Sequence, residues 1–108
     1  MNVIRMDQGR QTLLKIDGEL DANTAPELRP VLDAVVADQR QLVKVDLSGL
    51  SSIDSSGVGA LVSLYKRVRA AGGDVQITGL SQQPLAIFKL LRLDAVFDTS
   101  DEEVALQN

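Results

Sequence analysis

The sequence predicts an α/β fold, in which a mixed, mostly parallel sheet has an N-terminal antiparallel strand and is covered by about four helices. Short apolar segments alternate with stretches of helical periodicity, a pattern typical of parallel strands joined by crossover helices. The chain opens with two apolar segments around a glycine-containing turn, which indicates an antiparallel hairpin. The length of 108 residues, with 44% hydrophobic residues, suits one core, so we expect a single domain over residues 1–108.

The first elements expected are the two hairpin strands and a helix. The strands should span Asn2–Met6 and Thr12–Ile16, with the turn around Gly9. A helix should begin after Thr24, which is followed by a proline and, three residues later, by a glutamate, as in a capping box. Pro30 should kink or tighten the start of this helix, because proline lacks a backbone N–H.

The middle of the chain predicts two strands that flank a second helix. The first strand is the β-branched segment Leu42–Leu47, and Val75–Thr78 is the second. Between them a helix should begin near Ser56 and end at the glycines that follow Ala71. Residues at helical spacing should face the core: Val58, Leu61, Val62, Tyr65 and Val68.

The last quarter of the chain predicts a third helix and two short elements. The helix should begin at Ser81–Pro84 and end near Leu93–Asp94. Its inward residues should be Leu85, Phe88 and Leu91. Val96–Phe97 reads as a short extended stretch, and a brief final helix should run from Ser100 through Leu106.

Composition excludes several classes of function. Without cysteine or histidine the chain has no disulfide scaffold, no cysteine metal site and no Ser-His-Asp triad, so we expect no enzyme, cofactor or bound metal. A net charge of −4 and 3% aromatic residues argue against direct nucleic-acid binding. No segment reaches the roughly 18 apolar residues of a spanning helix, so we expect no membrane insertion and a cytoplasmic protein.

The segment Asp54-Ser55-Ser56-Gly57 places a pair of hydroxyl groups at the start of the second helix. Asp and Ser are ordinary N-cap residues, so capping alone accounts for much of the pattern. The free N–H groups and positive dipole of a helix N-terminus also favour an anion such as a phosphate. We therefore divide the role of Asp54 between capping the helix and orienting Ser56.

Two separated motifs resemble a known family. The run from Val45 to Gly59 resembles the signature of STAS domains, in particular of bacterial anti-sigma factor antagonists. The segment from Asp17 to Ala25 resembles the family's loop between the second strand and the first helix. The resemblance covers nearly the whole chain and implies the STAS fold.

The resemblance implies a phosphorylation-controlled partner switch in signal transduction. At the position of Ser56, the family is phosphorylated by a partner that is both a serine kinase and an anti-sigma factor. The unphosphorylated antagonist binds that partner and frees a sigma factor for transcription. A serine phosphatase of the metal-dependent class removes the phosphate. Asp21 matches the family's loop aspartate, near the serine, and Asp54 matches the motif aspartate.

Helical spacing also predicts a flat partner-binding face on the second helix, opposite its core residues. Gly59 and Ala60 should lie on this face. The two glycines in the first turns of the helix each cost about 1 kcal/mol relative to alanine, which favours close approach of a partner. Arg67 is about three turns from Ser56, so we expect no arginine of the chain beside the phosphate. The residues expected to bind the partner are Glu19, Asp21, Asp54, Ser55, Ser56, Gly57, Gly59, Ser63 and Arg67.

Two other functions remain open from the sequence. One is a STAS adaptor subunit of a membrane transport complex, and the other is a partner switch that controls secretion. An independent nucleotide hydrolase ranks last, because the chain has neither a glycine-rich phosphate loop with its lysine nor a metal-ligand cluster.

Overall fold

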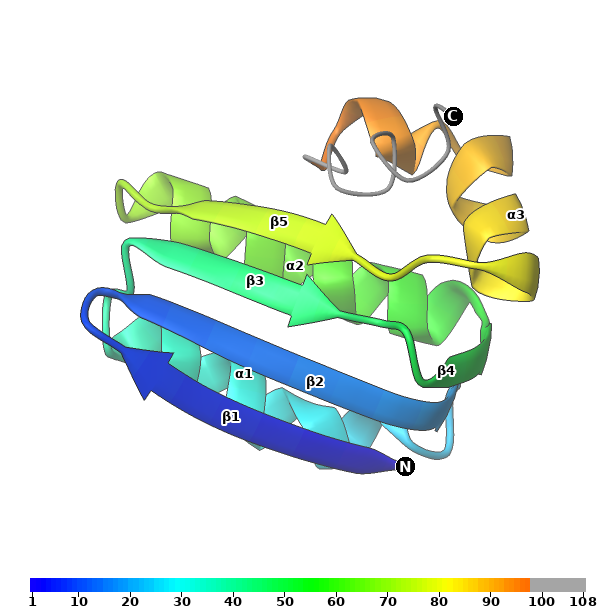
Figure 1. Ribbon diagram of the computed structural model, residues 1–108, viewed down its shortest axis with the longest axis horizontal. Helices are drawn as coiled ribbons and strands as arrows, with labels where there is room; N and C mark the ends of the chain where they lie inside the picture. Colours follow the sequence, from blue (N-terminus) through cyan, green and yellow to red (C-terminus); the bar gives the residue numbers. More distant parts are fainter. Residues whose placement is uncertain (98–108) are drawn as a thin grey trace.

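The computed structural model describes residues 1–97 and shows a sheet with the long helices packed on one face and a short helix at one end (Figure 1). The elements in chain order are β1 (Asn2–Gln8), β2 (Gln11–Leu20), α1 (Ala25–Ala37), β3 (Leu42–Asp46), β4 (Leu50–Ile53), α2 (Ser55–Ala70), β5 (Asp74–Thr78), α3 (Gln82–Leu90) and the 3-10 helix η1 (Leu93–Ala95). No helix in this part of the chain is both long enough and apolar enough to cross a membrane.

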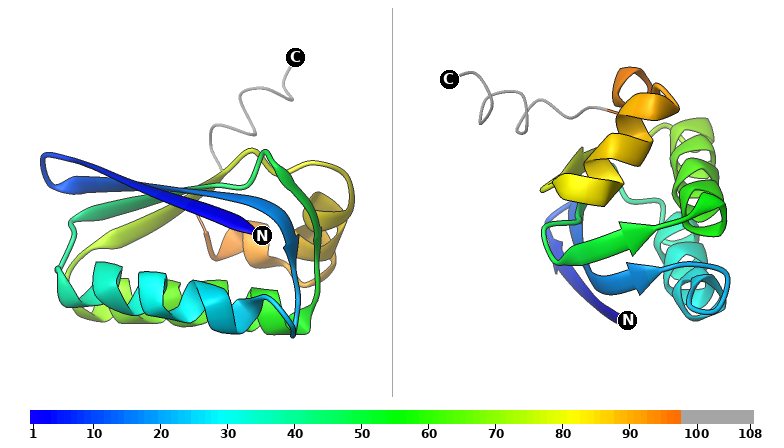
Figure 2. Two further views of the ribbon diagram at one scale, coloured as in Figure 1. Left: turned by 90° about the horizontal axis from the view of Figure 1, so that it is seen from below. Right: turned by 90° about the vertical axis from the view of Figure 1, so that its right-hand side faces the viewer.

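The sheet is mixed, as the sequence predicts. Its strand order is β1-β2-β3-β5, with β1 antiparallel to β2 and the remaining pairs parallel. The long strand β2 pairs with β3 over its first half and with β4 near its end. Both crossovers return under the same face, so α1 and α2 run parallel to each other and lie side by side (Figure 2).

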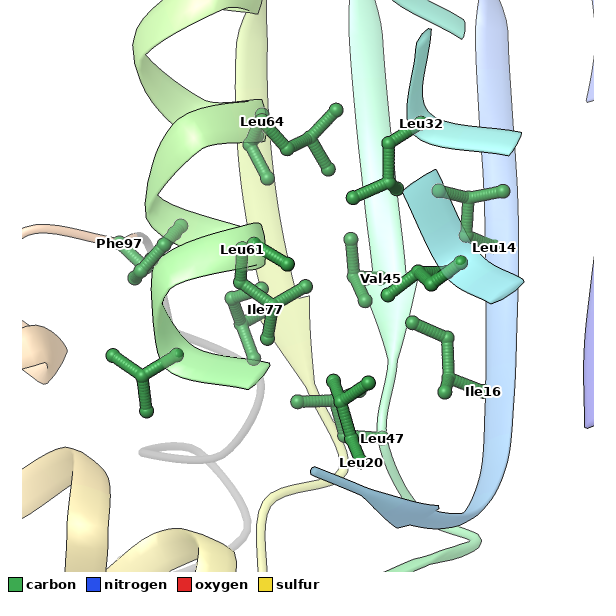
Figure 3. Packing of buried hydrophobic residues seen from close by; sticks show 14 of the residues in the cluster. Leu14, Ile16, Leu20, Leu32, Val45, Leu47, Leu61, Leu64, Ile77 and Phe97 are labelled. Carbon is green, nitrogen blue, oxygen red and sulfur yellow. The ribbon is translucent and has the colours of Figure 1, made fainter. Parts of the chain in front are cut away.

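One hydrophobic core fills the space between the sheet and these two helices (Figure 3). Alternate residues of the strands point into it, such as Leu14 and Ile16 of β2, which are fully buried. Leu32 of α1 and Leu61 of α2 enter the same core from the helix side, and Leu61 lies beside Ile77 of β5. The core therefore fixes which faces of α1 and α2 remain outside.

The segment before α2 differs from the sequence-based expectation. The strand that leads into this helix is β4, which periodicity did not predict, and not the segment Leu42–Leu47. Only Leu50 and Ile53 of β4 are buried, while the serines between them are exposed or half-buried. Four residues with two serines in the middle show too little alternation of apolar and polar residues to predict a strand. Pairing with β2 holds this segment in the extended conformation.

The core face of α2 is also shifted from the expected one. Leu64 is fully buried and Ala60 is 9% exposed, so Ala60 does not lie on an outer face. Val58, Leu61 and Val68 are buried as predicted, and Val62 and Tyr65 are partly buried and pack against the core. Tyr65 lies edge-on to the buried Phe97, with ring centroids 5.1 Å apart.

Two further expectations concern Pro30 in α1 and the end of α3, and the end of α3 differs from the prediction. α1 continues through Pro30, which is exposed. Because proline has no N–H, the carbonyl four residues earlier, in the first turn of the helix, lacks its usual hydrogen bond from this position. α3 ends at Leu90, before the expected boundary, and Leu91 is 51% exposed and outside the core. A left-handed residue, Arg92 with φ 57°, separates α3 from η1.

The remaining expectations concern the end of the chain. Val96 and Phe97 form a turn after η1 and not an extended stretch. The final helix expected from Ser100 lies outside the described residues. The described part thus has three α-helices and one 3-10 helix in place of about four helices.

Candidate functional site

The strands β2 and β4 end side by side. Leu20 and Ile53 are paired at the ends of these strands, and the N–H of Asp54 donates to the carbonyl of Leu20 at 3.1 Å. The next residues are Asp21, which leads to α1, and Asp54, which leads to α2. This pairing brings Asp21 and Asp54 together at the N-termini of two parallel helices.

Asp54 caps α2 with its side chain. Its backbone is extended, with φ −118° and ψ −172°, and its Oδ1 accepts the N–H of Ser56 at 2.9 Å and of Gly57 at 3.3 Å. An N-cap carboxylate of this kind satisfies N–H groups that have no partner within the helix. Because one of these bonds is to Ser56 itself, capping also fixes the backbone of that serine.

Ser55 and Ser56 form the first turn of α2. Ser55 is exposed and Ser56 is half-buried. Neither hydroxyl makes a hydrogen bond with another described residue, so both are free to react or to meet a partner. Their backbones are held by the helix while their side chains remain available.

A groove of about 640 Å³ runs beside these serines, between α1 and α2. Arg29 and Asp33 lie one turn apart on α1, and the guanidinium of Arg67 donates to the Asp33 carboxylate across the groove at 2.8 Å. The lining residues are Arg29, Leu32, Asp33, Ser55, Ser56, Gly59, Ala60, Ser63 and Arg67. The groove therefore joins the expected outer face of α2 to a strip of α1.

The glycines of the motif have different environments. Gly57 is buried, and a Cβ there would lie 2.6 Å from Cγ of Leu20 and 2.8 Å from the carbonyl of Leu20. Close packing on β2 thus requires this glycine, which the sequence instead predicted to be a partner-binding residue. Gly59 is exposed in the groove, and a Cβ there would have no neighbour within 4 Å.

The loop between β2 and α1 is held by its own side chains. Oδ1 of Asp21 accepts the N–H of Asn23 at 2.9 Å and of Thr24 at 3.1 Å. Oγ1 of Thr24 accepts the N–H of Asp21 at 2.9 Å and donates to the carbonyl of Glu19 at 2.8 Å. Thr24 therefore closes the loop and makes no side-chain cap bond to α1, contrary to the expected capping box. The Glu19 side chain is left exposed.

Sequence reasoning missed the α1 side of the groove and one support beneath it. Arg29 and Asp33 share a face at helical spacing, a detectable signal, but only the packing of α1 on α2 shows that this face meets Ser56. Gln83 of α3 bonds both backbone groups of Ile53: it accepts the N–H at 2.9 Å and donates to the carbonyl at 3.0 Å. This side chain covers the outer edge of β4, next to the cap of α2.

Comparison with known proteins gives a family and a set of relatives. The profile of a domain family described as "Mlab, STAS domain" matches residues 5–99. The chain is similar to the anti-sigma-B factor antagonist of Bacillus subtilis, with 32% identity over 87 residues, which cover 81% of this chain and 79% of that protein.

Solved structures share the fold over almost the whole chain. An anti-sigma factor antagonist from Mycobacterium paratuberculosis matches with a TM-score of 0.84 and 24% identity, covering 99% of this chain and 94% of that one. The Bacillus cell fate determinant SpoIIAA in its phosphorylated form matches with a TM-score of 0.73 and 20% identity, covering 98% of this chain and 97% of that one. At these identities the likeness establishes the fold.

Proposed function

The chain belongs to the STAS domain family, and we propose that it is an anti-sigma factor antagonist controlled by phosphorylation of Ser56. The observation that carries the proposal is the environment of this serine. Its backbone is fixed by Asp54 at the start of α2, while its hydroxyl is unbonded within the described residues and faces an open groove. An acceptor for a kinase needs both features, because the hydroxyl must be positioned and still accessible.

The partner in this proposal is an anti-sigma factor that is also a serine kinase. The unphosphorylated chain binds it and releases the sigma factor. The contact surface comprises the two loops at the ends of β2 and β4 and the groove side of α2. Its residues are Glu19, Asp21, Asp54, Ser55, Ser56, Gly59, Ser63 and Arg67.

The switch itself is a phosphoryl transfer. Oγ of Ser56 takes the γ-phosphoryl group of ATP, its proton passes to a base of the kinase, and ADP leaves. The phosphate adds a charge of about −1.5 to −2 at neutral pH. Asp54 and the exposed Glu19 already make this end of the molecule acidic. The added charge therefore weakens the complex, until a metal-dependent serine phosphatase hydrolyses the ester.

The names of the curated relatives favour this function over the transport adaptor and the secretion switch. The relative from Bacillus subtilis, 32% identical, is an anti-sigma-B factor antagonist, and the relative from Listeria monocytogenes, 27% identical, bears the same name. We accordingly place the chain in the bacterial cytoplasm, as a regulatory binding protein without catalysis of its own.

Phosphopeptide mapping tests the proposal. Incubation with the cognate kinase and ATP should add one phosphate to the wild-type chain, on Ser56. Ser56→Ala should remain unlabelled, while Ser55→Ala, the matched control one residue away, should be labelled normally. Phosphate found mainly on Ser55 or Ser63 would refute the assignment.

A further inference from the structure

The groove beside Ser56 contains an arginine that has no partner among residues 1–97. Of the charged residues that line it, Asp33 and Arg67 are bonded to each other at 2.8 Å. Arg29 makes no hydrogen bond or ion pair with any other residue in the described part of the chain, and it is exposed. Because the charges of Asp33 and Arg67 offset each other, the positive charge of Arg29 is left over in the groove. It lies across from the serines at the start of α2.

Helix geometry points this charge toward Ser56. α1 and α2 run parallel, and the contact between Asp33 and Arg67 sets their relative height. Arg29 lies one turn before Asp33, closer to the N-terminal end of the groove, where Ser56 lies. Side chains on a helix also lean toward its N-terminus, so the guanidinium extends in the direction of the serine.

The N-terminus of α2 cannot supply the counter-charge alone. The N–H groups of Ser56 and Gly57 are already bonded to the carboxylate of Asp54, at 2.9 and 3.3 Å. A phosphate on Ser56 would thus find these donors occupied and a carboxylate close by. Arg29 is the cation available on the opposite wall of the groove.

We propose that Arg29 binds the phosphate of phosphorylated Ser56 across the groove between α1 and α2. This inference rests on the proposed phosphorylation of Ser56, and it differs from the expectation that no arginine of the chain lies beside the phosphate. An arginine fork can make two charge-assisted hydrogen bonds to a phosphate. The modification then acts in two ways, because it adds charge and also closes the groove that forms part of the partner surface.

The test titrates a phosphate that is installed without the kinase. Phosphoserine is incorporated at position 56 during translation, in the wild-type chain, in Arg29→Gln and in Arg10→Gln. Arg10 is the matched control, because it is an exposed arginine in the turn between β1 and β2, at the other end of the strands. The second pKa of the phosphate is measured by phosphorus NMR, and circular dichroism verifies that each variant is folded.

A nearby guanidinium favours the dianion, so Arg29→Gln should raise the pKa of the phosphate by about half a unit or more relative to the wild-type chain. Arg10→Gln should titrate like the wild type. Equal pKa values in the wild type and Arg29→Gln would overturn the inference, as would equal shifts in the two variants. Since the phosphate is installed in translation, failure of the kinase to modify Ser56 would refute the proposed function separately.

Discussion

Gly59 and Gly57 lie two residues apart on α2, yet their substitution should have opposite effects on stability. Gly59→Ala adds a methyl group with no neighbour within 4 Å. It should stabilise the fold by about 1 kcal/mol, the ordinary advantage of alanine over glycine in a helix. Gly57→Ala should destabilise by about 1–3 kcal/mol, because its methyl group would lie 2.6 Å from Cγ of Leu20. Denaturant unfolding of both variants measures these changes.

Gly59→Ala also tests the partner surface. Gly59→Ala should fold well and still bind the kinase less tightly, because the new methyl group stands in the groove that we assign to the partner. Calorimetric titration gives the affinity. Wild-type affinity in Gly59→Ala would mean that no partner atom approaches this position closely.

Ser63 lies in the groove further along α2. Ser63→Glu should change the free energy of unfolding by less than about 0.5 kcal/mol, because the site is exposed. Its side chain would fill part of the groove, so affinity for the kinase should fall by about tenfold, or about 1.4 kcal/mol. The control is Ala70→Glu, which adds the same side chain at an exposed position of α2 outside the groove. If both variants bind like the wild type, the partner does not use this groove.

At the scale of elements, the short strand β4 depends on α3. Among the strands that the structure describes, β4 pairs only with β2, on one side. On the other side, Gln83 of α3 bonds the N–H and the carbonyl of Ile53. Gln83→Leu would leave both backbone groups without these bonds and should destabilise by about 1–3 kcal/mol. Gln83→Glu retains an acceptor for the N–H but no donor for the carbonyl, so its effect should be intermediate.

Hydrogen exchange locates this effect. The amide of Ile53 should exchange faster in Gln83→Leu, while the amide of Val45 in the central strand β3 should lose protection only as far as global stability falls. Unchanged exchange at Ile53 would show that β4 is held by β2 alone. The element matters for function because the cap residue Asp54 follows it directly.

At the scale of the whole molecule, the end opposite the serines is tied together by a polar network. Oγ1 of the buried Thr12 donates to Asp7 at 2.7 Å and accepts from Arg40 at 2.8 Å. Arg5 bonds Asp7 at 3.1 Å and Asp38, the C-cap of α1, at 2.7 Å. These contacts join the hairpin to the C-cap of α1 and to the loop between α1 and β3, far from the groove.

This network predicts a pH dependence of stability. The hydrogen bond from Thr12, and next those from Arg5, hold the pKa of Asp7 below its usual value of 3.8. The ionised carboxylate therefore stabilises the fold fully when the pH is above 3.8. This stabilisation is lost as the pH falls through the lower pKa of the folded state. Asp7→Asn should lower the melting temperature near neutral pH, and the difference from wild type should shrink as the pH falls below 3.8 and through the lower pKa of the folded state. A difference that stays constant with pH would contradict this role.

Several features of the protein follow from the sequence alone. Apolar periodicity predicted the mixed sheet and its N-terminal hairpin, because strands and crossover helices leave different repeats in the chain. The segment from Asp54 to Gly57 predicted the capped start of α2, since cap chemistry depends on residues only two or three positions apart. The two motifs together indicated the STAS family.

Only the tertiary structure decided which surfaces meet at Ser56. The strand β4 exists because β2 and Gln83 pair with its backbone, and no local signal encodes such partners. Arg29 lines the groove from α1, which ends well before Ser56 in the chain. Gly57 has to be a glycine because it packs against Leu20, more than thirty residues away. Local interactions determine caps and turns, whereas the groove arises from the packing of α1 beside α2, which depends on contacts between residues distant in the sequence.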